Sequence, residues 1–196
     1  MSKDYIIGID EVGRGCVAGP IIAAACLSRG RDNENKILAQ VKDSKKLTAK
    51  KREELFELLS KNFIWAVAEI DNKQIDEQGI QPANCLVVEI AVENLLKKLE
   101  NFEGQILADH IGGAHNYIKN KSIEFHIKGE SKFAEIAAAS ILAKVYRDKL
   151  MQEWHQKYPV YDFAKHKGYG TKQHLQIITE QGICSIHRQS FLQKYL

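Results

Sequence analysis

The sequence has none of the features that mark a disulfide-rich, zinc-binding or membrane protein. Its four cysteines are widely spaced and form no Cys-x-x-Cys pair; they are Cys16, Cys26, Cys85 and Cys184. Such spacing predicts reduced thiols rather than a disulfide framework or a zinc site. No apolar run reaches the length of a membrane span, and residues 1–4 lack the basic start and apolar core of a signal peptide. We therefore expect a soluble, cytoplasmic protein with no membrane partner.

The chain also lacks internal repeats, low-complexity linkers and a strong excess of charge. It has 28 Lys and Arg against 25 Asp and Glu residues, a net charge of +3, and a hydrophobic content of 44% over 196 residues. A chain of this size can bury one good core, so residues 1–196 are expected to form a single domain. The mild positive charge is compatible with a polyanionic partner, but many soluble proteins share it.

Apolar periodicity indicates two strands at the start and then strands interleaved with helices. We expect strands over residues 5–9, 17–27, 63–70, 106–108 and 123–127, and helices over residues 48–61, 82–99, 132–157 and 171–181. Thr48 is placed to cap the first helix, whose expected inner face is Leu55, Leu58 and Leu59. The polar segment 29–46 is expected to be a surface loop. This order indicates an α/β or mixed α+β sheet with helices on both faces.

Three of the expected strands end in acidic residues. The first runs into Asp10 and Glu11, the fourth into Asp109, and the fifth into a turn that contains Glu130. Strand ends in an open sheet gather at one edge, where ligand sites usually form. Carboxylates in this number suit Mg²⁺ or Mn²⁺ rather than zinc, and two such ions roughly 4 Å apart would activate water against a phosphodiester. A solvated turn residue is the better interpretation of any single acid, but not of the adjacent pair Asp10 and Glu11.

The first acidic pair is followed almost directly by Gly13, Arg14 and Gly15. Glycines let the backbone approach a ligand closely, and the Arg14 guanidinium can grip a phosphate. Acids beside a phosphate-binding arginine indicate metal-dependent phosphodiester chemistry. Further along, Lys45 and Lys46 form a basic cluster with residues 50–52 that could hold a duplex backbone, although residues 50–52 could equally be a solvated face.

With these motifs the chain resembles a known family, ribonuclease HII, the type 2 ribonucleases H. Residues 8–15, Gly-Ile-Asp-Glu-Val-Gly-Arg-Gly, with Ala-Gly-Pro at 18–20, are similar to the family's N-terminal signature. Further similar motifs follow in the family's order, at residues 43–47, 128–129, 137–145, 147–148, 166–171 and 187–191. The resemblance therefore covers nearly the whole chain.

The resemblance implies a ribonuclease H-like mixed sheet of about five strands flanked by helices, in a monomeric enzyme. It implies endonucleolytic cleavage of RNA in RNA–DNA hybrids and on the 5′ side of single ribonucleotides in duplex DNA, leaving 3′-hydroxyl and 5′-phosphate ends, with Mg²⁺ or Mn²⁺. By position, the metal-binding acids are Asp10, Glu11, Asp109 and Glu130. The family usually has Asp at the position of Glu130, proline at that of Cys16, and Gly-Asn at residues 110–111.

Substrate contacts follow from the same resemblance. The Gly13-Arg14-Gly15 turn is expected to contact the 2′-hydroxyl that separates RNA from DNA, and Tyr169 to pack on the neighbouring deoxyribose. Tyr169 lies between two glycines, which favours a protruding ring over a core position.

Several roles stay open from the sequence. Asp148 is a rival of Glu130 for the fourth metal position, but we interpret it mainly as an i, i+4 partner of Lys144. Ser140 and Lys144 would then face the phosphates. His187 and Arg188 could contact phosphate or tie the C-terminus down.

Two other functions compete with this one. The chain could be another two-metal nuclease on the same kind of sheet, such as a DNA junction resolvase, which would cut substrates made only of DNA. It could also be a non-catalytic hybrid-binding module, against which the intact acids argue. No segment for docking on a replication clamp is apparent.

Overall fold

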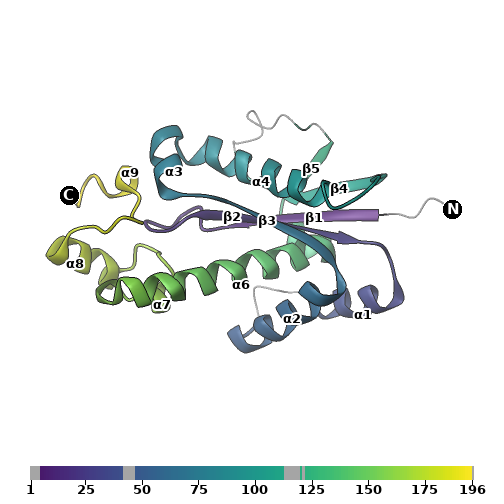
Figure 1. The fold of residues 1–196 in the computed structure, drawn as a ribbon, viewed down its shortest axis with the longest axis horizontal. Coiled ribbons are helices and arrows are strands. Elements are labelled where there is room, and N and C mark those ends of the chain that lie inside the picture. Colours follow the sequence, from purple (N-terminus) through teal and green to yellow (C-terminus); the bar gives the residue numbers. More distant parts are fainter. Residues whose placement is uncertain (1–4, 42–46, 113–119, 121, 196) are drawn as a thin grey trace.

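The computed structural model describes residues 5–41, 47–112, 120 and 122–195, and a single mixed sheet lies at its centre (Figure 1). Its strands are β1 (Tyr5–Val12), β2 (Ile21–Ser28), β3 (Ile64–Ile70), β4 (Gly104–Asp109) and β5 (Ile123–His126), in the order β3-β2-β1-β4-β5. β2 is antiparallel to β1 and β3, whereas β4 runs parallel to β1 and β5 runs parallel to β4. The predicted mixed five-stranded sheet is confirmed.

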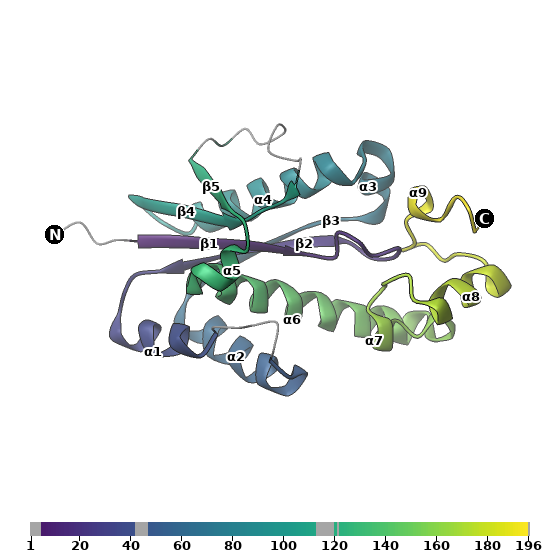
Figure 2. The same ribbon diagram turned by 180° about the vertical axis from the view of Figure 1, so that it is seen from behind.

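Helices cover both faces of this sheet (Figures 1 and 2). On one face lie α3 (Asn72–Gln78) and α4 (Ile80–Leu96), and on the other lie α1 (Asp32–Val41), α2 (Ala49–Asn62) and the long α6 (Ala134–Lys157). The short α5 (Gly129–Lys132) precedes α6. The chain ends with the 3-10 helix η3 (Pro159–Tyr161), α7 (Phe163–His166), α8 (Lys172–Gln181) and α9 (Gln189–Leu192). Among the helices of these described residues, none is long and apolar enough to span a membrane.

Strand β1 is buried on both faces, and its alternation decides where the acids point. Ile7 and Ile9 pack into the core shared with α4, which includes Val88 and Val92. Gly8 faces α6, and a Cβ there would lie only 2.1 Å from the backbone carbonyl carbon of Glu135, so α6 rests directly on the strand backbone. Because successive side chains of a strand point to opposite faces, Asp10 projects toward α6 and Glu11 toward α4.

The prediction of a loop over residues 29–46 is wrong for residues 32–41, which form α1; residues 29–31 are irregular as expected, and residues 42–46 lie outside the described residues. Ile37, Leu38 and Val41 are buried on one side of this helix, in the core shared with α2 and α6. Only these three positions are apolar and buried, which is too few for periodicity to reveal a helix. Glu34, fully buried, accepts hydrogen bonds from the backbone and the side chain of Arg29.

The prediction for the next helix is largely confirmed. Thr48 caps α2 by accepting a hydrogen bond from Lys51 N at 3.2 Å. Leu55 and Leu59 are buried as expected, but Leu58 is 39% exposed and does not belong to the inner face.

The C-terminal elements pack at the far end of α6 around a small core of their own, which includes Met151, Phe163, Ile178 and Leu192. The segment between α7 and α8 runs back to the loop that joins β1 to β2: Val17 N donates to Gly168 O at 2.9 Å, and Cys16 pairs with Tyr169 in an isolated β-bridge. This packing brings the C-terminal Tyr169 next to the N-terminal glycine turn.

Candidate active site

The acids that the sequence singled out come together at the carboxyl ends of β1 and β4. Asp10, Glu11, Asp109 and Glu130 line one cavity of about 360 Å³. Asp10 and Glu11 belong to β1, Asp109 is the last residue of the parallel strand β4, and Glu130 lies in α5, which follows β5. The cavity wall is completed by residues of β1, α2 and α6, which are Val12, Arg52, Ser140, Ile141 and Lys144.

Burial and mutual repulsion make the ionised forms of these acids costly. Burial raises the pKa of Asp10 well above its ordinary value of 3.8, with further increases from the charges of Glu11 and Asp109, while the Ser140 hydroxyl lowers it. Burial and then Asp109 raise the pKa of Glu11 from 4.5 to about 7, against the lowering effect of Arg14. Like charges that are buried together call for a compensating cation.

Asp109 and Glu130 are linked through the backbone. Gly129 N donates to Asp109 Oδ1 at 2.8 Å, which ties the start of α5 to the end of β4. Lys128 reaches this turn in the left-handed region, with φ of 56°. Glu130 follows directly and is 8% exposed, so the turn holds its carboxyl group inside the cavity wall.

The rival acid Asp148 is occupied elsewhere. It forms a salt bridge with Lys144, one helical turn away on α6, as the i, i+4 interpretation predicts. Asp148 lines a separate, smaller cavity with Ala49, Glu53 and Val145. Lys144 lines the acidic cavity together with Ser140. The Ser140 side chain hydrogen-bonds to Asp10 and lowers its pKa.

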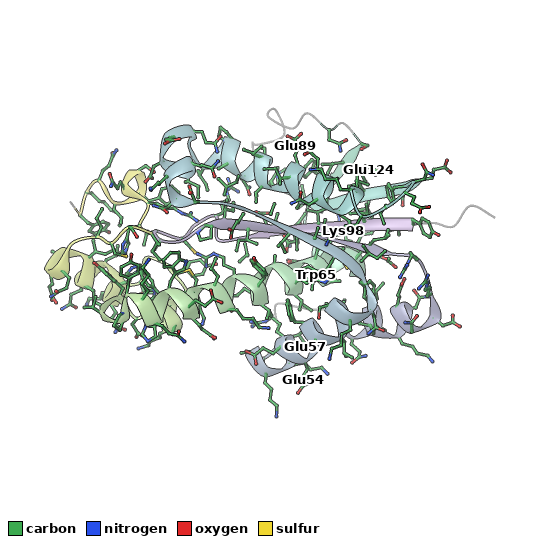
Figure 3. All side chains as sticks on the ribbon, viewed as in Figure 1. Glu54, Glu57, Trp65, Glu89, Lys98 and Glu124 are labelled. Carbon is green, nitrogen blue, oxygen red and sulfur yellow. The ribbon has the colours of Figure 1, made fainter. Side chains whose placement is uncertain are left out.

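The basic cluster divides into residues with different surroundings. Arg52 lines the acidic cavity and donates to Leu47 O at 3.1 Å. Lys51 instead pairs with Glu54 at 3.5 Å on an outer surface of α2, where Glu54 is labelled in Figure 3. Lys45 and Lys46, the predicted backbone contacts, lie outside the described residues.

The glycine turn is built differently at its two glycines. Gly13 has φ of +94°, and a Cβ there would lie 2.4 Å from Nε of Arg147, so its backbone is packed against that arginine. At Gly15, by contrast, no atom of the described residues lies within 4 Å of the Cβ position. Arg14 lies between them, beside Gly112 of the loop after β4, and its charge lowers the pKa of Glu11. The side of the turn that is open to a ligand is therefore at Gly15.

Tyr169 protrudes from its loop, as the flanking glycines predict. Its side chain is 42% exposed, and with Gly15 and Val17 it borders a shallow depression beside the glycine turn. The loop behind it is held firmly, because Tyr169 O bonds to Nδ1 of His174 at 2.9 Å and Gly168 N donates to Nδ1 of His166 at 3.2 Å.

His187 and Arg188 are buried, with 1% and 0% exposure. Arg188 donates from Nε to Gly19 O and from Nη1 to Arg14 O, both at 3.0 Å. His187 bonds through Nε2 to His174 at 3.0 Å. Of the two alternatives left open by the sequence, these contacts favour the one in which both residues tie the C-terminal segment to the core.

The sequence interpretation gave no role to Arg147 and no separate role to Arg52. Arg147 is fully buried beneath the glycine turn, and Arg52 faces the acids from α2. Arg52 belongs to a basic run whose members look alike in the sequence. Arg147 belongs to a motif of the resemblance, at residues 147–148, which was the only signal that could have drawn attention to it.

Known proteins resemble this chain over nearly its whole length. A sequence model of the family described as ribonuclease HII matches residues 7–194. Ribonuclease HII from Caldicellulosiruptor saccharolyticus is 47% identical over 193 residues, covering 98% of this chain and 89% of the relative. Ribonuclease HII from Borrelia hermsii is 46% identical over 186 residues, covering 95% of this chain and 98% of the relative.

Solved structures show the same fold. Ribonuclease H2 from Pyrococcus horikoshii superimposes with a TM-score of 0.78 at 26% identity, over 97% of this chain and 96% of that one. Ribonuclease HII from Archaeoglobus fulgidus, solved in complex with PCNA, gives a TM-score of 0.75 at 26% identity, over 94% and 93% of the two chains. Bst-RNase HIII in complex with Mn²⁺ shares the fold at 23% identity and a TM-score of 0.74, over 92% of this chain and 63% of that one.

From the near-complete family match and the close relatives, the chain belongs to the ribonuclease HII family and is a ribonuclease H.

Proposed function

We propose that this ribonuclease H cuts the RNA strand of RNA–DNA hybrids and also cuts on the 5′ side of a single ribonucleotide in duplex DNA. The products would carry 3′-hydroxyl and 5′-phosphate ends. The observation that carries the proposal is the cavity in which Asp10, Glu11, Asp109 and Glu130 gather. The glycine turn with the open Gly15 follows Glu11 in the chain, and the exposed Tyr169 lies beside that turn.

The four acids suit Mg²⁺ or Mn²⁺, because carboxylate oxygens are the ligands that these hard cations prefer. Their burial supports this assignment, since burial and like charges raise the pKa values of Asp10 and Glu11, and a bound cation would offset the cost of ionising them. Among the described residues, no three Asp, Glu, His or Cys side chains already stand together as a metal site. The ions, when bound, would supply an activated water and stabilise charge on the leaving oxygen.

The remaining residues would position the substrate. Arg14 lies beside Glu11, where its guanidinium can hold a phosphate next to the acids. Gly15 leaves room for a sugar to reach the backbone, where a 2′-hydroxyl can be recognised. Tyr169 offers an exposed ring for the next sugar, which in a junction lacks that hydroxyl. Lys144 and Arg52 add positive charge to the wall of the cavity.

The first experiment uses three labelled duplexes: one with a single embedded ribonucleotide, one hybrid and one made only of DNA, each in Mg²⁺ and in Mn²⁺. We expect the wild type to cut the first two, with a single product from the embedded ribonucleotide, and Asp10→Asn to lose turnover while keeping duplex binding. Cutting of the all-DNA duplex would favour the resolvase reading. Failure to cut in either metal by a folded protein would contradict the proposal.

Tyr169→Ala tests how the junction is read. We expect this variant to lose cleavage of the single-ribonucleotide duplex far more than cleavage of the hybrid. Tyr146→Ala is the matched control, because Tyr146 is a partly buried tyrosine of α6 beside Glu69 and Glu153. Equal losses on both substrates for Tyr169→Ala would remove the proposed role.

A further inference from the structure

Arg147 is a buried cation held by backbone carbonyls. It is fully buried on α6, and its guanidinium donates from Nε to Pro20 O at 3.0 Å, from Nη1 to Lys167 O at 2.7 Å and from Nη2 to Ala18 O at 3.0 Å. Within the described ranges, no carboxylate forms an ion pair with it. Burying a charge in this way is costly, and an apolar side chain would fill the space without that cost. What the arginine adds is a three-way link between separate segments.

The segments that Arg147 links are the two expected to read the substrate. Ala18 and Pro20 follow the glycine turn, and Lys167 lies two residues before Tyr169. The backbone continues the link, because Val17 N and Ala18 N both donate to Gly168 O, at 2.9 and 3.2 Å. We call this contact between residues 13–20 and 166–170 the loop joint.

Glycines on both sides make room for the arginine. A Cβ at Gly13 would lie 2.4 Å from Arg147 Nε, and one at Gly168 would lie 3.3 Å from Arg147 Nη2 and 2.4 Å from Ala18 O. Both glycines have positive φ, +94° and +83°. The loop joint is therefore close-packed around the guanidinium, and its spacing depends on that group.

The tyrosine loop is held by hydrogen bonds on its other side. His166 and His174 hold Gly168 N and Tyr169 O, and His174 is held in turn by His187. We expect a loop anchored in this way to move as a unit, so that a change at Arg147 shifts Tyr169 relative to the glycine turn.

We propose that Arg147 is a specificity-positioning residue, which sets the spacing between the Gly13–Gly15 turn and Tyr169 and so the preference for a single ribonucleotide over a continuous hybrid. This inference rests on the proposed function, in which two neighbouring sugars are read by the two loops. A duplex with one ribonucleotide needs the glycine turn on its single 2′-hydroxyl and Tyr169 on the neighbouring deoxyribose at the same time. A hybrid presents a 2′-hydroxyl at every position of its RNA strand, so it tolerates a looser joint.

Arg147→Lys tests the inference, because it keeps the charge but replaces three separate donor nitrogens by one ammonium nitrogen, which cannot occupy all three donor positions. The measured quantity is the ratio of kcat/KM on the single-ribonucleotide duplex to kcat/KM on the hybrid. We expect this ratio to fall about tenfold or more, since a small displacement of a positioning element can cost that much. Ile178→Ala, a buried change in the same C-terminal core, is the control for lost stability and should leave the ratio unchanged.

A double-mutant cycle with Tyr169→Ala shows whether Arg147 acts through the tyrosine. We expect Arg147→Lys to cause no further fall of the ratio once Tyr169 is removed. If the two substitutions lower the ratio independently, so that their effects multiply in the double variant, the inference is overturned. It is also overturned if Tyr169→Ala lowers the ratio and Arg147→Lys leaves it unchanged. The proposed function would survive both results. An unchanged ratio in Tyr169→Ala would overturn the proposed reading of the junction and this inference with it.

Gly168→Ala provides a second route if Arg147→Lys does not fold. Its Cβ would push against Ala18 O at 2.4 Å, with Arg147 Nη2 at 3.3 Å, and so open the loop joint in a chain that still carries the arginine. The same fall of the ratio is expected, with hybrid cleavage retained. Retained cleavage of both substrates at the wild-type ratio would overturn the inference.

Discussion

Replacing Glu11 with glutamine should stabilise the metal-free enzyme at high pH while leaving its stability at low pH unchanged. In the folded protein the pKa of Glu11 rises from 4.5 to about 7, chiefly through burial and then through Asp109. Between these values the folded chain holds more protons than the unfolded chain, so this group makes stability fall as the pH rises from about 4.5 to 7. Glutamine does not titrate and therefore removes that loss.

The magnitude follows from the shift. A rise from 4.5 to about 7 corresponds to roughly 3 kcal/mol at about 1.4 kcal/mol per pKa unit. Because neighbouring acids also gain protons and relax, we expect about 2 kcal/mol, which is about 4–8 °C in Tm for a domain of this size.

The assay is thermal unfolding followed by circular dichroism, in EDTA, from pH 5 to pH 8. The Tm difference between Glu11→Gln and wild type should be about a quarter of its full value at pH 5, because pH 5 already lies above the unfolded pKa, and should reach its full value at pH 8. Taking the difference cancels the titration of groups common to both proteins.

Glu57→Gln, at an exposed position on α2 (labelled in Figure 3), is the control and should show no such trend. Added Mn²⁺ should raise the Tm of the wild type at pH 8 and narrow the gap. A difference that is constant with pH, or negative at pH 8, would refute the reasoning.

Three further outcomes are expected. Gly8→Ala should destabilise the fold by about 3 kcal/mol and reduce cleavage, because its Cβ would meet the Glu135 backbone at 2.1 Å. A Tm within about 2 °C of wild type in a melting experiment would contradict this, since that shift corresponds to only about 1 kcal/mol. Thr48→Ala should cost about 1 kcal/mol through loss of the cap on α2, measurable by urea unfolding, and a stability equal to wild type would show that the cap is dispensable. Burial lowers the pKa of His187 from 6.5 to about 4, so its contribution to stability is complete above pH 6.5 and lost as the pH falls toward 4. His187→Gln should therefore reduce the fall of the unfolding free energy between pH 6.5 and 4. An unchanged fall in the variant would assign this loss of stability to other groups.

Much of the architecture was predictable because the sheet and the long helices carry strong patterns. The apolar run of β1, the stripe of α4 and the Thr48 cap of α2 each combine a local preference with burial. The prediction failed at α1, where Ile37, Leu38 and Val41 are buried within an otherwise polar segment. The error at Leu58 has the same origin, since the packing of α2 against α1 and α6 decides which of its leucines are covered.

The gathering of the acids at one edge of the sheet was predictable, but the surroundings of individual residues were not. The acids could be named because each follows an apolar strand, where an uncompensated carboxylate is unfavourable. Asp148 and Glu130 could not be separated by spacing alone, because the choice depends on the salt bridge of Asp148 with Lys144 and on the turn that carries Glu130. Arg52 likewise differs from Lys51 only in the direction its side chain takes from α2.

The sequence by itself determined the chemistry of this protein, because residue types and their order along the strands specify which groups are available and at which strand ends they stand. Only the tertiary structure decided which of those groups meet. Arg147 lies 127 residues from Pro20 and 20 residues from Lys167, and it joins them because α6 crosses beneath both loops. Contacts over such separations depend on how helices and strands pack, and local sequence preference carries no information about that packing.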